Sequence, residues 1–218
     1  MVCTEHATSD LRMQKPNRNP NHPKKGSTTK VEPIRELQAI CSIKEALHDN
    51  ARNYCLFVLG INTAYRASEL LSLSCGQVSH LSPGDTLSVR QSKTSKHRTI
   101  ALNGAAVSSI RRWLSIHPSP DPCHPLFISR TGNAITVPTL NNMVKKWCAN
   151  QGLPGNYGSH SLRKTWGFHQ LRHNHRTPPH MMLPVLMSAF GHASQKQTLD
   201  YLCIQSDEVL RLFMELEL

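Results

Sequence analysis

The residues best suited to chemistry lie in the segment 158–201, which is rich in arginine, histidine and tyrosine but contains a single acidic residue. His160 and Arg163 are three residues apart, so both side chains project from one face of a helix. A guanidinium fork matches the oxygens of a phosphate, and an imidazole adds a donor or a proton shuttle. With His192 and Tyr201 further along, this composition favours a phosphate ester over a sugar, a peptide or a metal.

Two earlier stretches hold further candidates. Arg66 lies where the chain turns into a helical run, and Glu69 follows it three residues later. Lys93 and Lys96 lie in a basic tip between two strand-like runs. Taken singly, such residues are more often a surface pair, a local ion pair, a solvated charge, a cap or a half-buried aromatic. Their combination and order give these candidates more weight than any one of them has alone.

Apolar periodicity predicts the elements that position these residues. Helices are expected around residues 34–47, 54–59, 64–73, 104–116, 138–150 and 207–216. Strands are expected at 86–91 and 98–102, with a short strand candidate at 126–128. Leu37 should face inward on the first helix, the second should be central, and Ser68 should cap the third. The predicted class is α+β, predominantly α-helical with a small antiparallel sheet.

Composition narrows the partners. The 218 residues carry a formal charge of +11, which favours a polyanion, nucleic acid before an anionic membrane surface. Residues 1–32 hold many proline, asparagine and lysine residues and are expected to form a disordered basic arm, either a solvated tail or a phosphate-tracking extension. No apolar run is long enough to span a membrane, and no secretory signal is visible. Seven scattered cysteines support no disulfide framework, so we expect a reducing cytoplasm.

Four sequence strings bring the candidates together in one order: TAYRASELLSL, QSKTSKHRTIAL, HSLRKT and AFGHASQKQTLDYL. They resemble the motifs of the tyrosine recombinase (phage integrase) family, and the resemblance runs from Pro33 to Leu218. It implies the catalytic-domain fold of that family over residues 33–218. A separate core-binding domain, usual in the family, is not seen before Pro33.

The resemblance implies that Tyr201 cleaves one DNA strand and forms a 3′-phosphotyrosyl bond. Because an unperturbed phenol has a pKa of about 10, this nucleophile needs help near neutral pH. Arg66 and Arg163 match the two arginines that hold the non-bridging oxygens. Positioning and charge stabilisation are what phosphoryl transfer needs most, so no metal or other cofactor is expected.

The remaining catalytic candidates also come from the resemblance. Lys93 matches the hairpin lysine that protonates the 5′ oxygen of the leaving group, and Lys96, in the same tip, is the rival. His160 and His192 match the other phosphate-contacting positions, with His160 an acceptor for the tyrosine proton. Glu69 is expected behind the site, where it would orient Arg66.

Basic residues outside this set are expected to contact DNA, namely Lys96, Arg98, Lys164, Arg172 and Arg176. The segment 170–182 looks long and basic for a loop, and it is either a solvated insert or an added DNA contact. Its neighbourhood also offers four histidines as metal ligands, but no Asp, Glu or Cys completes a four-ligand site. These histidines are His169, His173, His175 and His180.

The sequence therefore predicts a recombinase or integrase that acts on duplex DNA in integration or excision of a mobile element. Self-association on DNA and accessory DNA-binding proteins are expected, without a membrane. The apolar stripe of the C-terminal helix either packs in the core or docks into a neighbouring copy. Two alternatives stay open: a non-catalytic DNA-binding relic or regulator with the same fold, and DNA relaxation like that of type IB topoisomerases.

Overall fold

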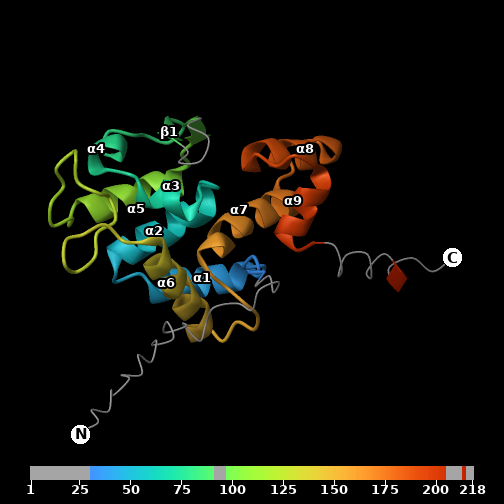
Figure 1. Cartoon of the computed structure of the whole chain (residues 1–218), viewed down its shortest axis with the longest axis horizontal. Coiled ribbons are helices and arrows are strands. Elements are labelled where there is room, and N and C mark those ends of the chain that lie inside the picture. The colour runs from blue at the N-terminus through green and yellow to red at the C-terminus, as the bar shows by residue number, and fades with distance from the viewer. Residues whose placement is uncertain (1–29, 91–96, 205–212, 215–218) are drawn as a thin grey trace, which may run out of the picture. The chain divides into compact units, whose positions relative to one another are not determined.

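The computed structural model describes residues 30–90, 97–204 and 213–214 (Figure 1). The described residues from Val31 onward belong to one compact unit. Its elements are, in order, α1 (Leu37–Ala46), α2 (Ala51–Asn62), α3 (Ala67–Leu71), α4 (Cys75–Val78), β1 (Thr86–Arg90), β2 (His97–Ala101), α5 (Gly104–Leu114), α6 (Val137–Asn150), α7 (Ser159–His173), α8 (Pro179–Phe190) and α9 (Gln195–Leu202).

Helix α2 lies at the centre of the main core, as its apolar sequence predicts. Residues 55–60 are all buried, and α2 packs against α1, α3, α5 and α7. The contact with α7 is close, because a Cβ added at Gly60 would lie 2.5 Å from Cδ1 of Leu162. Such an approach fixes the start of α7, which carries His160 and Arg163, against the centre of the fold.

A second, smaller apolar cluster joins α7, α8 and α9, which are drawn in orange to orange-red and lie together in Figure 1. Phe168, Leu186, Phe190 and Leu202 are among its buried members. Trp166 packs against this cluster and is partly buried, while Trp147 belongs to the main core. The second cluster positions the helix that carries Tyr201.

The sheet consists of β1 and β2, which pair antiparallel with Leu87 opposite Ile100. Leu87 and Val89 are buried and alternate with exposed residues, so one face packs on the core. Both predicted strands are confirmed, each within one residue at either end. The predicted basic tip with Lys93 and Lys96 lies outside the described residues.

Three local predictions are wrong. Residues 126–128 form no strand, since Ile128 makes an isolated bridge to Ala134 instead. Ser68 does not cap α3, because the helix already starts at Ala67, with Arg66 as its N-cap. Leu37 is 54% exposed, because α1 begins there and buries the stripe that starts two residues later.

The basic segment 170–182 is not a long loop. Helix α7 continues to His173 and α8 begins at Pro179, so the connection is short. The Asn174 side chain closes the turn by accepting hydrogen bonds from the amides of Arg176 and Thr177, at 3.0 and 3.2 Å. The proline pair that interrupts the pattern opens the next helix, where a missing N–H costs nothing.

Most of the predicted C-terminal helix, 207–216, falls outside the described residues, apart from Phe213 and Met214, whose side chains are exposed. Within the parts of the chain that the structure describes, no helix has the length and apolar character to cross a membrane.

Candidate active site

A buried carboxylate, Glu69 on α3, lies at the centre of the site. Its Oε2 accepts a 2.7 Å hydrogen bond from the Arg66 amide, and its Oε1 one of 2.7 Å from the Arg66 guanidinium. Oε2 also lies 3.5 Å from Nε of Arg98 and 3.9 Å from a terminal nitrogen of Arg163. Burial alone would raise the pKa of Glu69, but these hydrogen bonds and charges outweigh it and hold the pKa below its usual value.

Arg163, on the first turns of α7, is 3% exposed. Its guanidinium donates to the carbonyl oxygens of Ala64 and Phe190, at 2.5 and 2.8 Å. It also lies over the Phe190 ring, 4.8 Å from the centroid. Burial is the main reason that its pKa falls, to about 10, so Arg163 remains charged at neutral pH.

Ala64 adopts an unfavourable backbone conformation to make one of these contacts. Its φ of 54° lies in the left-handed region, which disfavours residues with a Cβ by about 1 kcal/mol. The same residue accepts the Arg163 hydrogen bond and is buried in the second cluster. The turn after α2 therefore holds both Arg66 and a carbonyl that orients Arg163.

His192 follows the left-handed Gly191, which ends α8 with a φ of 67°. Its Nδ1 lies 3.1 Å from the hydroxyl of the buried Thr198. The ring stacks on Phe190, with centroids 5.2 Å apart. Burial, followed by the charges of nearby arginines, lowers the pKa of His192, so the imidazole is neutral at pH 7.

Tyr201, on α9, faces this group of side chains. Its ring meets His192 edge to face at 5.0 Å and lies 5.2 Å from the Phe190 ring. Its hydroxyl oxygen is buried and lies near the Arg163 guanidinium, without a hydrogen bond of normal geometry to it. Burial raises the pKa of Tyr201, and the nearby Arg163 opposes this increase. The phenol is therefore protonated at neutral pH and would need a base in order to act as a nucleophile.

His160 lies one turn before Arg163 on the same face of α7, with its side chain exposed. Desolvation by the surrounding protein, then the charges of Arg163, Lys164 and Arg66, lowers its pKa below the ordinary 6.5. A neutral imidazole at pH 7 can accept a proton. The fold thus brings six of the predicted residues together: Arg66, Glu69, His160, Arg163, His192 and Tyr201.

The residues expected to contact DNA are distributed differently. Arg98 and Lys164 are 9% and 4% exposed, so they do not lie on an open surface as expected. Arg98 is held between Glu69 and the carbonyls of Ala189 and Phe190 at the end of α8. Arg172 and Arg176 are exposed, at the far end of α7 and after it. Lys93 and Lys96 lie outside the described residues.

Sequence reasoning missed the groups that hold these residues in place. Thr198 orients His192, Phe190 contributes a ring and a carbonyl, and Ala64 contributes a carbonyl. Residue type does not reveal a backbone acceptor. Thr198 could have been singled out from the sequence, because it lies on the same short helix as Tyr201, one turn before it.

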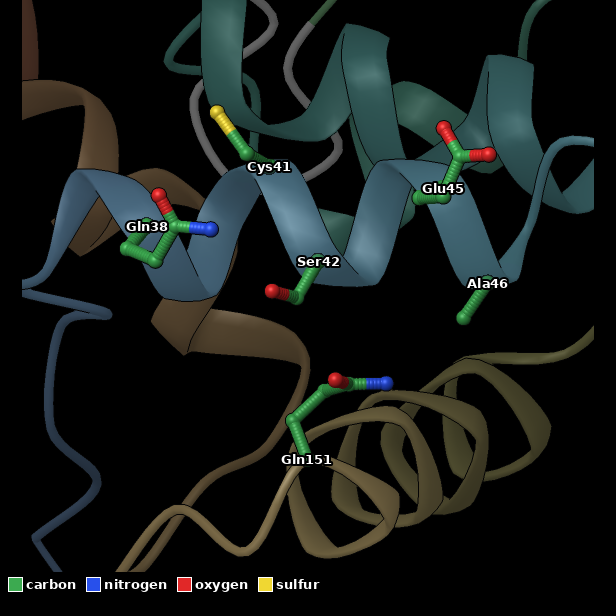
Figure 2. Close-up of a pocket in the computed structure, with 6 residues that line it drawn as sticks. All are labelled: Gln38, Cys41, Ser42, Glu45, Ala46 and Gln151. Carbon is green, nitrogen blue, oxygen red and sulfur yellow. The ribbon is translucent and has the colours of Figure 1, made fainter.

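A metal centre and a separate pocket are the competing possibilities for a site. Among the described residues, no group of three His, Cys, Asp or Glu side chains is arranged to hold a metal ion. An open pocket lies between α1 and the end of α6, where Ser42 and Gln151 point toward the gap (Figure 2). Its lining has no arginine, histidine or tyrosine: Gln38, Cys41, Ser42, Glu45, Ala46 and Gln151. The arginine-rich site is therefore a better candidate for phosphate chemistry than this pocket.

Known proteins with similar sequences identify the family. The model of the phage integrase family matches residues 33–208, most of the chain. This chain belongs to the phage integrase family. It is also 32% identical over 179 residues to the probable integrase/recombinase YoeC of Bacillus subtilis, covering 81% of this chain and 92% of YoeC.

A second relative is longer than this chain. The tyrosine recombinase XerC of Psychromonas ingrahamii is 25% identical over 166 residues, which cover 74% of this chain and 52% of XerC. The chain thus spans about half the length of the XerC relatives that it matches.

Solved structures of the family share the fold. The XerA recombinase superposes with a TM-score of 0.64 at 20% identity, covering 84% of this chain and 65% of XerA. XerH bound to a palindromic difH substrate, a post-cleavage complex, gives 0.63 at 20% identity, covering 93% of this chain and 57% of XerH. The predicted fold class, mostly helical with a small antiparallel sheet, is confirmed.

Proposed function

We propose that this chain cleaves and rejoins duplex DNA through a covalent bond between Tyr201 and a 3′ phosphate, as a site-specific recombinase or integrase. The observation that carries the proposal is the convergence of four separate segments: Arg66 and Arg163 meet on the buried Glu69, and His192 and Tyr201 pack together beside Arg163. Membership of the phage integrase family and the likeness to YoeC support it.

In the proposed first step, the phenolic oxygen of Tyr201 attacks the phosphorus of a phosphodiester, and the bond from phosphorus to the 5′ oxygen breaks. The phenol proton passes to His160. The departing 5′ oxygen takes a proton from Lys93, with Lys96 as the alternative donor. No electrons are exchanged, and the tyrosyl ester conserves the bond for the reverse attack by a 5′ hydroxyl.

The arginines would stabilise the charge that develops on the non-bridging oxygens. The Arg66 side chain is 40% exposed, so it can reach a phosphate at the surface. A guanidinium has five N–H donors. Arg163 can therefore keep its bonds to Ala64 and Phe190 and still donate to a phosphate. No metal or organic cofactor takes part in this proposal.

A nicked suicide duplex tests the proposal, since loss of the short strand downstream of the scissile bond traps the covalent intermediate. We expect a protein–DNA adduct that resists denaturation, forms without Mg²⁺ and is absent in Tyr201→Phe. The candidate duplexes are taken from the DNA on either side of the gene that encodes this chain. An adduct of equal yield in Tyr201→Phe would disprove the role of Tyr201.

The same assay separates the alternatives. DNA binding without an adduct on any duplex of the panel would identify a non-catalytic DNA-binding protein with this fold. Relaxation of a supercoiled plasmid without Mg²⁺, and without recombinant products, would identify activity like that of type IB topoisomerases.

The proposed substrate also determines the proposed partners. We infer that copies of the chain assemble on duplex DNA, in part through residues 207–216, with accessory DNA-binding proteins. A solved structural neighbour, a lambda integrase dimer bound to a core site, supports assembly on DNA. The proposed setting is the cytoplasm during integration or excision of a mobile element, which agrees with six free cysteines among the described residues.

A further inference from the structure

Residues 31–35, which we call the strap, cross from the N-terminal side of the chain to α7 and α9. The Ile34 amide donates to the hydroxyl of Thr165 at 2.8 Å, and Nε2 of His169 lies 3.0 Å from the Ile34 carbonyl. Both partners are on α7. Arg35 donates to the carbonyl of Cys203 at 2.9 Å, one residue beyond the end of α9. The strap therefore contacts both helices of the candidate site.

Lys164 is the side chain where these elements meet. Its Nζ donates to the strap carbonyl of Val31 at 2.7 Å and lies 3.5 Å from Sγ of Cys203. The same Nζ is 4.8 Å from the centroid of the Tyr201 ring, a cation–π contact. Lys164 is 4% exposed and directly follows Arg163. A buried lysine that joins two separate segments, the strap and the end of α9, is costly to place unless its contacts are satisfied.

The end of α9 needs such a restraint. Cys203 adopts a φ of 61°, a left-handed conformation that is unfavourable for a residue with a Cβ. Its thiol also lies 3.6 Å from the Val31 carbonyl. Contacts from Lys164 and Arg35 hold this strained residue, which is two positions after Tyr201.

We propose that Lys164 is a positioning residue for Tyr201, and that it acts by tying the end of α9 to the strap. The part concerning strand cleavage rests on the proposed function, whereas the tie itself does not. Lys164 touches no DNA in this proposal, unlike the expectation from sequence. Its ammonium group fixes where the Tyr201 ring lies relative to Arg163 and His192.

The first test needs no DNA. Site-resolved alkylation by iodoacetamide, read by mass spectrometry, reports the exposure of Cys203, and the fully buried Cys55 on α2 reports global unfolding. We expect Lys164→Met to raise the Cys203 rate at least about fivefold with Cys55 still protected. Removing a nearby positive charge makes a thiol less nucleophilic. An increase in the alkylation rate of Cys203 would therefore report movement of the chain. Lys164→Arg should restore most of the protection, and Lys145→Met, an exposed lysine on α6, should match the wild type.

A Cys203 rate in Lys164→Met within twofold of the wild type would overturn the proposal. Parallel exposure of Cys55 and Cys203 would also overturn it, since Lys164 would then be a general core stabiliser. Arg35→Gln, which cuts the other contact between the strap and α9, provides an independent variant. It should also raise the alkylation rate of Cys203. An unchanged rate would mean that the strap does not hold the end of α9, and the proposed tie would be wrong.

The second test uses the suicide duplex. We expect Lys164→Met to slow adduct formation at saturating DNA about tenfold, while its affinity for duplex stays within twofold of the wild type. Lys164→Arg should recover most of the rate. Weaker binding with a shallower salt dependence would instead mean that Lys164 contacts a phosphate, and the proposal would fail. If the wild type forms no adduct, the proposed function fails, and the Cys203 test still decides the role of Lys164.

Discussion

Replacing Glu69 by glutamine should strongly destabilise the protein, because this one carboxylate forms ion pairs with three guanidinium groups. The change keeps the size of the side chain and removes its charge. Arg98 and Arg163 would then remain charged and buried beside a neutral amide. The amide of Arg66 would keep an oxygen acceptor in one orientation of the glutamine.

The size of the effect follows from burial. Removing one partner of a buried ion pair costs about 3–5 kcal/mol, because the remaining charge loses its compensation. The Arg66 contribution is smaller, since its side chain is 40% exposed and solvent screens such pairs to about 1 kcal/mol or less. We therefore expect Glu69→Gln to lower the free energy of unfolding by about 3 kcal/mol.

Urea denaturation followed by circular dichroism measures this difference, with Glu45→Gln, an exposed carboxylate on α1, as the matched control. The folded-state pKa of Glu69 lies below the ordinary glutamate value of 4.5. Its contribution is therefore complete above about pH 4.5 and is lost as pH falls through the folded pKa. Acidification should cost the wild type more stability than Glu69→Gln. A loss of stability no larger than that of the control would refute this account of the site.

Two further outcomes are expected. Gly167→Ala should destabilise the protein by about 1–2 kcal/mol, because the added Cβ would lie 2.4 Å from Cζ of Phe190. This cost exceeds the gain in helix propensity. Gly104→Ala is the control, and it should be neutral or stabilising because nothing lies within 4 Å of the added Cβ. The rate of adduct formation should be constant above pH 7 and fall below the lowered pKa of His160, because the neutral ring is the proposed base. A rate that instead rises tenfold per pH unit from 7 to 9 would mean that Tyr201 ionises without His160.

The sequence predicts the local elements well because their signals are local. The apolar periodicity of α2 and the alternation of β1 and β2 appear in the structure where expected. The prediction for Ser68 is wrong because the Glu69 side chain accepts the Arg66 amide and starts the helix earlier. The prediction for the segment 170–182 is wrong because its proline pair starts a helix. Local patterns do not distinguish a proline that ends a helix from one that begins the next.

The candidate site is predictable in its residue types but not in its supports. Composition favours phosphate chemistry in the segment 158–201, and the resemblance to the tyrosine recombinase family adds Arg66 and the expected role of Tyr201. The burial of Arg98 and Lys164 is not predictable, because a basic side chain is expected to be exposed unless its acceptors are known. Those acceptors are backbone carbonyls at the end of α8 and at Val31, which come from distant parts of the chain.

The strap gives the protein's N-terminal side a mechanical link to its reactive end. Any affinity tag or fluorescent fusion added at the N-terminus is joined, through residues 1–30, to a segment bonded to α7 and to Cys203. A comparison of tagged and untagged forms should therefore include the alkylation rate of Cys203. In evolution, the same link would let changes in the leading segment shift the Tyr201 helix without a substitution in the candidate site.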